Sequence, residues 1–258
     1  MTALAYLVLF CIIAIGSLIA VSVANERERR TRLIRRKLKD LKRKVDELEE
    51  LVIEVDLLVE SRAIAKIIND EIIDMLQAMI KLDPSATYLH ANLGNAEKRS
   101  EELSNESQER TLSRLRESDS QIARAQHLLN EAGRVLKHQH AIGNISLEEN
   151  NLFITQLSWS YLMVDVVSHI AQGHKALNRS DILTAHAFYK RAQQTLSQSA
   201  HSDHRRHRMI KELGEILSNR RKSLSTDLMP ETHFNPDESD TTTYTPPPPE
   251  QDAQAAAK

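Results

Sequence analysis

The hydropathy pattern begins with a continuous apolar segment from Ala3 to Ala24, and the chain has no charged residue before Glu26. An α-helix of about 20 apolar residues spans the hydrocarbon core of a bilayer, which is about 30 Å thick. Eleven basic and three acidic residues follow between Glu26 and Lys44. By the positive-inside rule, residues 1–25 are predicted to be a single-pass transmembrane anchor of the plasma (inner) membrane, with the N-terminus outside and the remaining chain cytoplasmic.

A cleaved signal peptide is the alternative interpretation of the same segment. Ser22-Val23-Ala24 resembles a small-x-small cleavage site. The positively charged region that opens a signal peptide is missing, however, and a strongly basic stretch directly after the cleavage site would oppose translocation. Cys11, the one cysteine, lies inside the apolar segment. The rest of the chain therefore has no disulfide, which is typical of a reducing compartment.

After the basic residues, apolar positions recur at alternating steps of four and three residues. This heptad seam, called the seam below, comprises Ile34, Leu38, Leu41, Val45, Leu48, Val52, Val55 and Val59. The spacing predicts a helical stalk over residues 26–60, basic first and then acidic. Two arrangements stay open: a parallel coiled-coil homodimer, or an amphipathic helix that packs on its own domain.

The basic run has two interpretations, which are compatible with each other. Its residues nearest the apolar segment are Arg27, Arg29, Arg30, Arg32, Arg35, Arg36, Lys37 and Lys39. They set the topology, and they can also contact anionic lipid head groups, at about 1 kcal/mol for each Lys or Arg near the surface. The lipid bilayer is thus an expected partner. Nucleic-acid binding has little support, because no aromatic residues are interleaved to stack on bases.

The pattern from residue 61 to 224 predicts an all-α cytoplasmic domain. Aromatic residues make up 4% of the chain and glycine only 6 residues, which disfavours β-sheets. Ser146-Leu147-Glu148-Glu149 is predicted to be a capping box that starts a helix. The predicted helices span about 61–82, 87–103, 108–138, 147–177, 182–197 and 203–222, and they are expected to form an antiparallel bundle or a repeat-like array.

Two stretches resemble the tetratricopeptide repeat, a helix-turn-helix of 34 residues. Residues 82–96 resemble the end of one repeat and the first helix of the next, with Gly94 at a helix crossing. Residues 166–196 place small or aromatic residues at the packing positions, namely Gly173, Ala185, Tyr189 and Ala192. The large first-helix positions of the family hold His169, Gln172 and Ala176 instead, which departs from its pattern. The resemblance implies a helical hairpin at 166–196.

No motif for catalysis or cofactor binding is present in the sequence. It contains no glycine-rich phosphate loop and no His-Glu-x-x-His motif. His201, His204 and His207 have a spacing that could share a metal ion, but three arginines lie among them and oppose a further cation. We therefore predict no catalytic residue, no cofactor and no metal ligand.

From residue 225 to 258 the helical pattern ends. Prolines, threonines and acidic residues dominate, and Pro246–Pro249 favour polyproline II. This composition predicts a disordered acidic tail.

The whole pattern favours a membrane-anchored helical scaffold or adaptor that binds an unidentified protein at the cytoplasmic face. The alternatives are an enzyme with an unrecognised helical active site, and a module that binds anionic lipid or nucleic acid.

Overall fold

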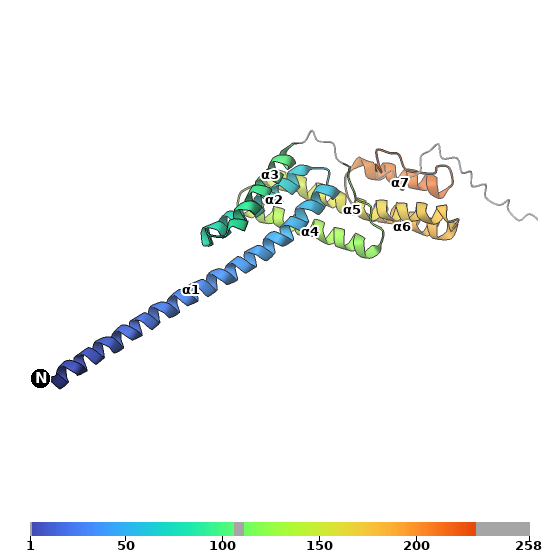
Figure 1. The fold of residues 1–258 in the computed structure, drawn as a ribbon. Coiled ribbons are helices and arrows are strands. Elements are labelled where there is room, and N and C mark those ends of the chain that lie inside the picture. Colours follow the sequence, from blue (N-terminus) through green and yellow to red (C-terminus); the bar gives the residue numbers. More distant parts are fainter. Residues whose placement is uncertain (1, 106–110, 231–258) are drawn as a thin grey trace, which may run out of the picture. The chain divides into compact units, whose positions relative to one another are not determined.

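The computed structural model describes the backbone of residues 2–105 and 111–230, and side chains from Ser22 onward except Val23. The described residues form seven α-helices and no strand (Figure 1), which confirms the predicted all-α fold class. The helices are α1 (Thr2–Leu58), α2 (Arg62–Leu82), α3 (Thr87–Ser104), α4 (Asp119–Ala141), α5 (Leu147–Asn178), α6 (Ile182–Gln198) and α7 (His204–Leu217).

Helix α1 is unbroken over 57 residues and contains the apolar segment, the basic run and the seam. At 1.5 Å per residue it is about 85 Å long, and it projects far beyond α2 and α3 (Figure 1). The side chains of residues 1–21 and 23, on which the predicted anchor depends, lie outside the described set. Among the residues that are described, no helix has the length and apolar character needed to cross a membrane.

The chain forms two compact units. The first unit comprises residues 1–110 and 123–160, and the second unit comprises residues 111–122 and 161–258. Helix α5 contributes its residues up to Ser160 to the first unit and the remainder to the second. The predicted boundary between stalk and body, after Glu60, falls inside the first unit.

The core of the first unit includes the C-terminal part of α1. Val45, Val52, Val55 and Val59 of the seam are buried there, as is Leu48. Helix α1 packs against α2, and α2 packs against α3. The second contact includes a hydrogen bond from the buried Asn69 amide to the Ala96 carbonyl oxygen, at 2.8 Å. For residues 45–59, the structure therefore shows packing within the chain, the second of the two arrangements that the heptad pattern left open.

Helix α4 begins at Asp119, about eleven residues later than the pattern of apolar residues predicted. Ser118 accounts for this start, because its side-chain oxygen accepts from the Gln121 N–H at 3.4 Å and Gln121 accepts from the Glu117 N–H at 2.9 Å. Such a Ser-x-x-Gln sequence is a helix-starting signal. Upstream, the Arg116 N–H donates to the Ser168 hydroxyl at 2.8 Å. This bond holds the non-helical segment before α4 against α5.

The predicted capping box of α5 is confirmed. The Glu149 N–H donates to the Ser146 hydroxyl at 3.1 Å, and the Ser146 N–H donates to the Glu149 carboxylate at 2.8 Å. These hydrogen bonds lower the pKa of the Glu149 carboxyl. The two reciprocal bonds satisfy N–H groups that would otherwise lack partners at a helix start. The turn before the cap uses Gly143 at a φ of +85°, a conformation that favours glycine.

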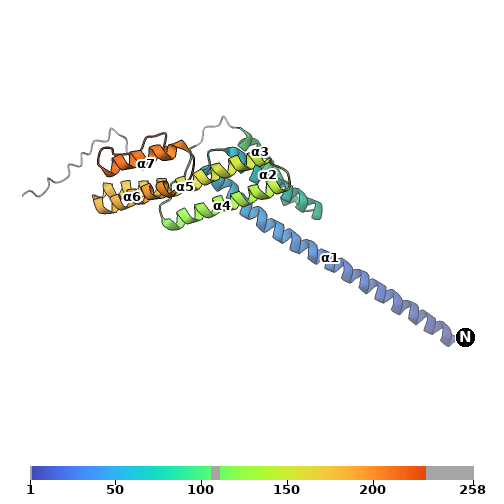
Figure 2. The ribbon, with the colours of Figure 1, turned by 180° about the vertical axis from the view of Figure 1, so that it is seen from behind.

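The second unit contains more folded chain at its C-terminal end than predicted. Helix α7 ends at Leu217, and the segment after it packs back onto the unit with Leu224, Leu228 and Met229 buried. Helices α6 and α7 lie side by side, as the front and back views both show (Figures 1 and 2). The predicted tail, residues 225–258, therefore includes at least five residues that are ordered parts of the fold. Residues 231–258 lie outside the described residues.

Candidate functional site

The part of α1 between Glu26 and Lys44, called the projecting segment below, presents apolar side chains outside the core. Ile34 is 37% exposed and Leu33 is 63% exposed, while Leu38 and Leu41 are half-buried. Since Ile34, Leu38 and Leu41 belong to the seam, its first three positions continue the stripe whose later positions are buried. The stripe thus runs out of the core of the first unit onto a helix surface that faces solvent.

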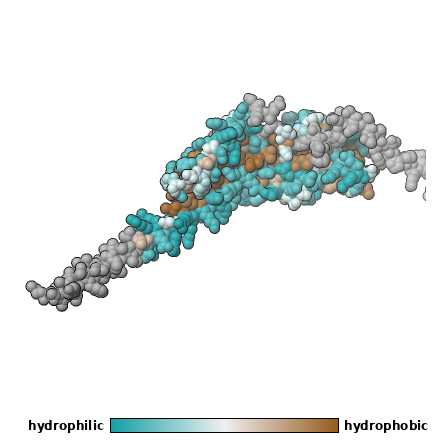
Figure 3. All heavy atoms as spheres, viewed as in Figure 1, coloured by the Kyte–Doolittle hydropathy of each residue, from teal (hydrophilic) through white to brown (hydrophobic). Residues whose placement is uncertain are grey.

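The predicted basic residues all lie exposed on this segment, and it is coloured mostly hydrophilic in Figure 3. Arg30 pairs with Glu26 at 3.4 Å, Arg32 with Glu28 at 2.5 Å, and these are i, i+4 pairs along the helix. Exposed pairs of this kind contribute little to stability. Toward the body, Arg35, Lys37 and Lys42 have no acidic partner within the described chain. Their charge is therefore available to an anionic group from outside.

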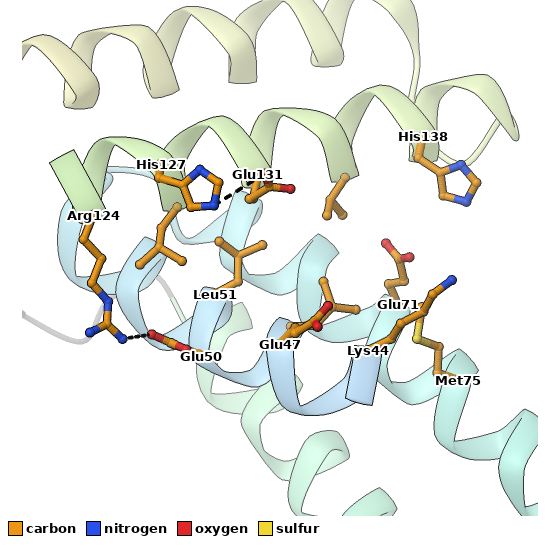
Figure 4. Close-up of a pocket in the computed structure, with 13 residues that line it drawn as sticks. Lys44, Glu47, Glu50, Leu51, Glu71, Met75, Arg124, His127, Glu131 and His138 are labelled. Atoms are coloured by element: carbon orange, nitrogen blue, oxygen red, sulfur yellow. Dashed lines mark hydrogen bonds and ion pairs between the residues drawn. The ribbon is translucent and has the colours of Figure 1, made fainter. Parts of the chain in front are cut away.

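A groove of about 660 Å³ lies in the first unit between α1, α2 and α4 (Figure 4). Its apolar lining consists of Leu48, Leu51, Met75, Leu128 and Val135. Leu48 is also a seam residue, seven positions after Leu41 and fourteen after Ile34. Positions seven residues apart lie on one face of a helix. The exposed end of the seam is therefore continuous with the groove.

Two pairs of titratable side chains at the edge of the groove contact each other. Arg124 binds Glu50, and this partner raises the pKa of the Arg124 guanidinium. His127 lies 3.8 Å from the Glu131 carboxylate (Figure 4). Lys44 also lines the groove. A ligand of the groove would hence contact apolar side chains at its centre and both signs of charge at its edge, where Glu47 and Glu71 also line it.

The four predicted packing residues of the hairpin at 166–196 are placed in the second unit. Ala185, Tyr189 and Ala192 of α6 are buried. A Cβ atom on Gly173 of α5 would lie 2.8 Å from Tyr189 Cδ1 and 3.0 Å from its Cζ, so the glycine and the tyrosine ring are in direct contact. The Tyr189 hydroxyl is 2.7 Å from His174 Nδ1, and burial raises the pKa of the tyrosine.

We expect Gly173→Ala to destabilise the second unit by about 1–3 kcal/mol, because the added methyl group would overlap a buried ring that is also fixed by a hydrogen bond. Gly94→Ala is the matched control. Nothing lies within 4 Å of a Cβ at Gly94, which is in an exposed part of α3. Alanine there should stabilise the helix by up to about 1 kcal/mol. Chemical denaturation followed by circular dichroism measures both effects, and equal midpoints would contradict the close contact.

The surroundings of Gly94 also test the resemblance of residues 82–96 to the tetratricopeptide repeat. Gly94 was expected at a helix crossing, but no neighbouring atom approaches it. That expectation was wrong, because the packing face of α3 comprises Leu89, Ala96 and Leu103 instead. Residues 82–96 thus lack the helix crossing that the resemblance implied, and the repeat-like hairpin at 166–196 stays a prediction.

The basic start of α7 is bonded within the second unit. Arg205 binds Asp203 and keeps the pKa of that carboxyl low. Arg206 donates to the Leu196 carbonyl oxygen at 3.0 Å, and Arg208 to Asp227 at 2.8 Å. These arginines brace loops and helix ends. They give no support to a free basic surface at this position.

Sequence reasoning missed the groove. Met75, Leu128 and Arg124 were not singled out, since each lies beside the main apolar stripe of its helix. A signal exists in α4, where Leu128 and Val135 form a second stripe at a spacing of seven residues. Comparison of the chain with protein-family models, curated proteins and solved structures yields no match. The functional argument therefore depends on the geometry of the chain itself.

Proposed function

We propose that the protein is a membrane-anchored helical scaffold that binds another protein at the cytoplasmic face. The observation that carries the proposal is the continuity of α1, one helix from Thr2 to Leu58. The same helix carries the apolar segment, then the basic run, and then residues buried in the core of the first unit. A helix of this kind connects a membrane anchor to a folded body without a flexible linker.

The projecting segment has the length of a spacer. From Ala24 to Val45 the helix rises by about 30 Å. With residues 1–25 in the membrane, the first basic residues would lie among the lipid head groups, where cations are favoured on the cytoplasmic side. The core of the first unit would then stand away from the bilayer, and the face of α1 between the core and the bilayer would be accessible to a partner.

The surface of the first unit supports a binding role rather than a catalytic one. Exposed seam residues lead into a groove with an apolar lining, as protein ligands require. At its edge, Arg124 of α4 forms an ion pair with Glu50 of α1. Such an arrangement recognises shape and apolar surface. The unidentified partner is thus expected to be a protein.

The topology gives a direct test. A fluorescent protein fused after Lys258 should fluoresce, and alkaline phosphatase at the same position should be inactive, because the body lies in the cytoplasm. Carbonate extraction should leave the chain in the membrane fraction. Replacing Arg27, Arg29, Arg30 and Arg32 by Glu should reduce the correctly oriented fraction, since these residues set the orientation. An active phosphatase fusion, or release of the chain by carbonate, would refute the anchored scaffold.

A further inference from the structure

We infer that the face of α1 from Ile34 to Lys44 binds an acidic amphipathic helix of a partner protein. This inference rests on the proposed function and names the chemistry of the partner. The surface has two properties that select such an occupant. It offers an apolar stripe at helical spacing, and cations border that stripe on both sides.

The apolar stripe has the spacing of a helix-binding surface. Ile34 is 37% exposed and Leu38 and Leu41 are half-buried, whereas Val45, Leu48 and Leu51 are buried in the core. From Ile34 to Lys44 the stripe is about 15 Å long. A helix that packs along it with apolar residues at steps of three and four would cover it over about three turns.

The flanking charges define the sign of the occupant. In the heptad with Leu38 and Leu41 as core positions, Arg35 and Lys42 border one side of the stripe, and Lys37 and Lys44 border the other. Glu49 is the first acidic residue at a flanking position. Flanking positions of paired helices contact each other and set partner choice. A helix with Glu or Asp at its own flanking positions is therefore complementary to this surface.

A second copy of the chain fits this surface poorly. In a parallel pair in register, Lys37 of one copy would face Lys42 of the other, and Arg30 would face Arg35. Like charges at these positions select against pairing. In addition, Val45, Val52 and Val59 are already buried in the first unit and cannot pair with another chain.

Lipid head groups account for only the first part of the basic run. Along an upright helix, Arg35 is about 16 Å and Lys44 about 30 Å from Ala24. Both distances exceed the Debye length of about 8–10 Å at physiological ionic strength. The cations from Arg35 to Lys44 therefore lie beyond the reach of the membrane surface, next to the exposed end of the seam.

The test uses the full chain in nanodiscs of neutral phosphatidylcholine and three synthetic peptides. One peptide of three heptads has Leu at the core positions and Glu at the flanking positions. The second has Lys in place of Glu, and the third has the composition of the first in scrambled order. Fluorescence anisotropy should show that the Glu peptide binds and that the other two bind at least about tenfold more weakly. Hydrogen exchange should show protection of residues 34–44.

Charge reversal provides the matched variants. Lys37→Glu with Lys42→Glu should weaken the Glu peptide about tenfold and strengthen the Lys peptide. Arg36→Glu with Lys39→Glu makes the same change of charge on the opposite face of the helix, and it should leave both affinities nearly unchanged. The emission of Trp159, the single tryptophan, verifies that the first unit is folded in every variant.

Several outcomes would overturn the inference. Equal binding of the scrambled peptide would show unspecific attraction to charge. Dimers in sedimentation experiments that the Glu peptide does not dissociate would assign the surface to a second copy. Tighter peptide binding after removal of residues 231–258 would assign it to the chain's own tail, and loss of binding only with anionic vesicles as competitor would assign it to lipid. Failure of peptide binding in a chain that stays membrane-anchored refutes this inference alone, whereas release by carbonate refutes the proposed function.

Discussion

Val52→Asp should unfold the first unit. Val52 is 1% exposed and lies on the face of α1 that enters the core. An aspartate there would either bury an unpaired carboxylate or take up a proton to stay neutral, and both cost free energy. The loss is expected to exceed about 4 kcal/mol, a large part of the 5–15 kcal/mol that stabilises a typical domain.

Ile53→Asp is the matched control for this prediction. Ile53 is the next residue along α1 and is 55% exposed, so its aspartate would remain in water. We expect a change of less than about 1 kcal/mol. Urea denaturation followed by Trp159 emission measures the first unit, because this residue is buried there. Equal midpoints for the two variants would show that α1 does not enter the core. The result would favour a separate coiled-coil stalk instead.

The difference between these two neighbours also shows what the heptad pattern could predict. The spacing of the seam correctly predicted which face of α1 is apolar, and Val52 lies on that face. It could not say what covers that face, because burial by α2 and burial by a second copy require the same periodicity. Leu51, Ile53, Leu57 and Leu58 widen the apolar stripe in the sequence, which is a local signal for packing within the domain. Of these, Leu51 and Leu58 are buried, whereas Ile53 and Leu57 are exposed.

Helix starts were predictable where a polar capping signal stands alone, and less so where apolar residues precede it. The Ser146–Glu149 box gave the start of α5 to the residue. For α4, Leu112 and Leu115 extended the apolar period upstream, and the prediction followed them past Ser118. Tertiary contacts decide such cases, since the bond from Arg116 to Ser168 holds that stretch in a non-helical conformation.

The candidate site was predictable in its linear parts only. The basic run and the seam are visible as patterns in consecutive residues. The groove is not, because Leu51, Met75 and Leu128 come from three helices whose arrangement the sequence does not encode locally. The same limit applies to the C-terminal segment. Composition predicted disorder from residue 225, whereas buried polar contacts keep residues 223–229 on the second unit.

Glu212 of α7 is the centre of those contacts and the basis of the second large prediction. The residue is 8% exposed, and its carboxylate accepts two hydrogen bonds from Ser225, one from the N–H and one from the hydroxyl, both at 2.8 Å. Arg221 lies 3.6 Å from the same carboxylate. The carboxylate thus holds the segment after α7 against the helix. These hydrogen bonds place Leu224 and Leu228 in their buried positions.

Glu212→Ala should therefore release residues 219–229 from the second unit, at a cost of about 3 kcal/mol, because two charge-assisted hydrogen bonds are lost and Arg221 loses its buried partner. Glu215→Ala removes a carboxylate from the same helix that contacts Arg221 only at 3.8 Å and is more exposed, so it should cost less than about 1 kcal/mol. Hydrogen exchange of the full chain measures the release directly. Amides from Arg220 to Met229 should exchange much faster in Glu212→Ala than in Glu215→Ala, while those of α6 keep their protection. Unchanged exchange in both variants would mean that apolar burial of Leu228 and Met229 holds the segment without the carboxylate.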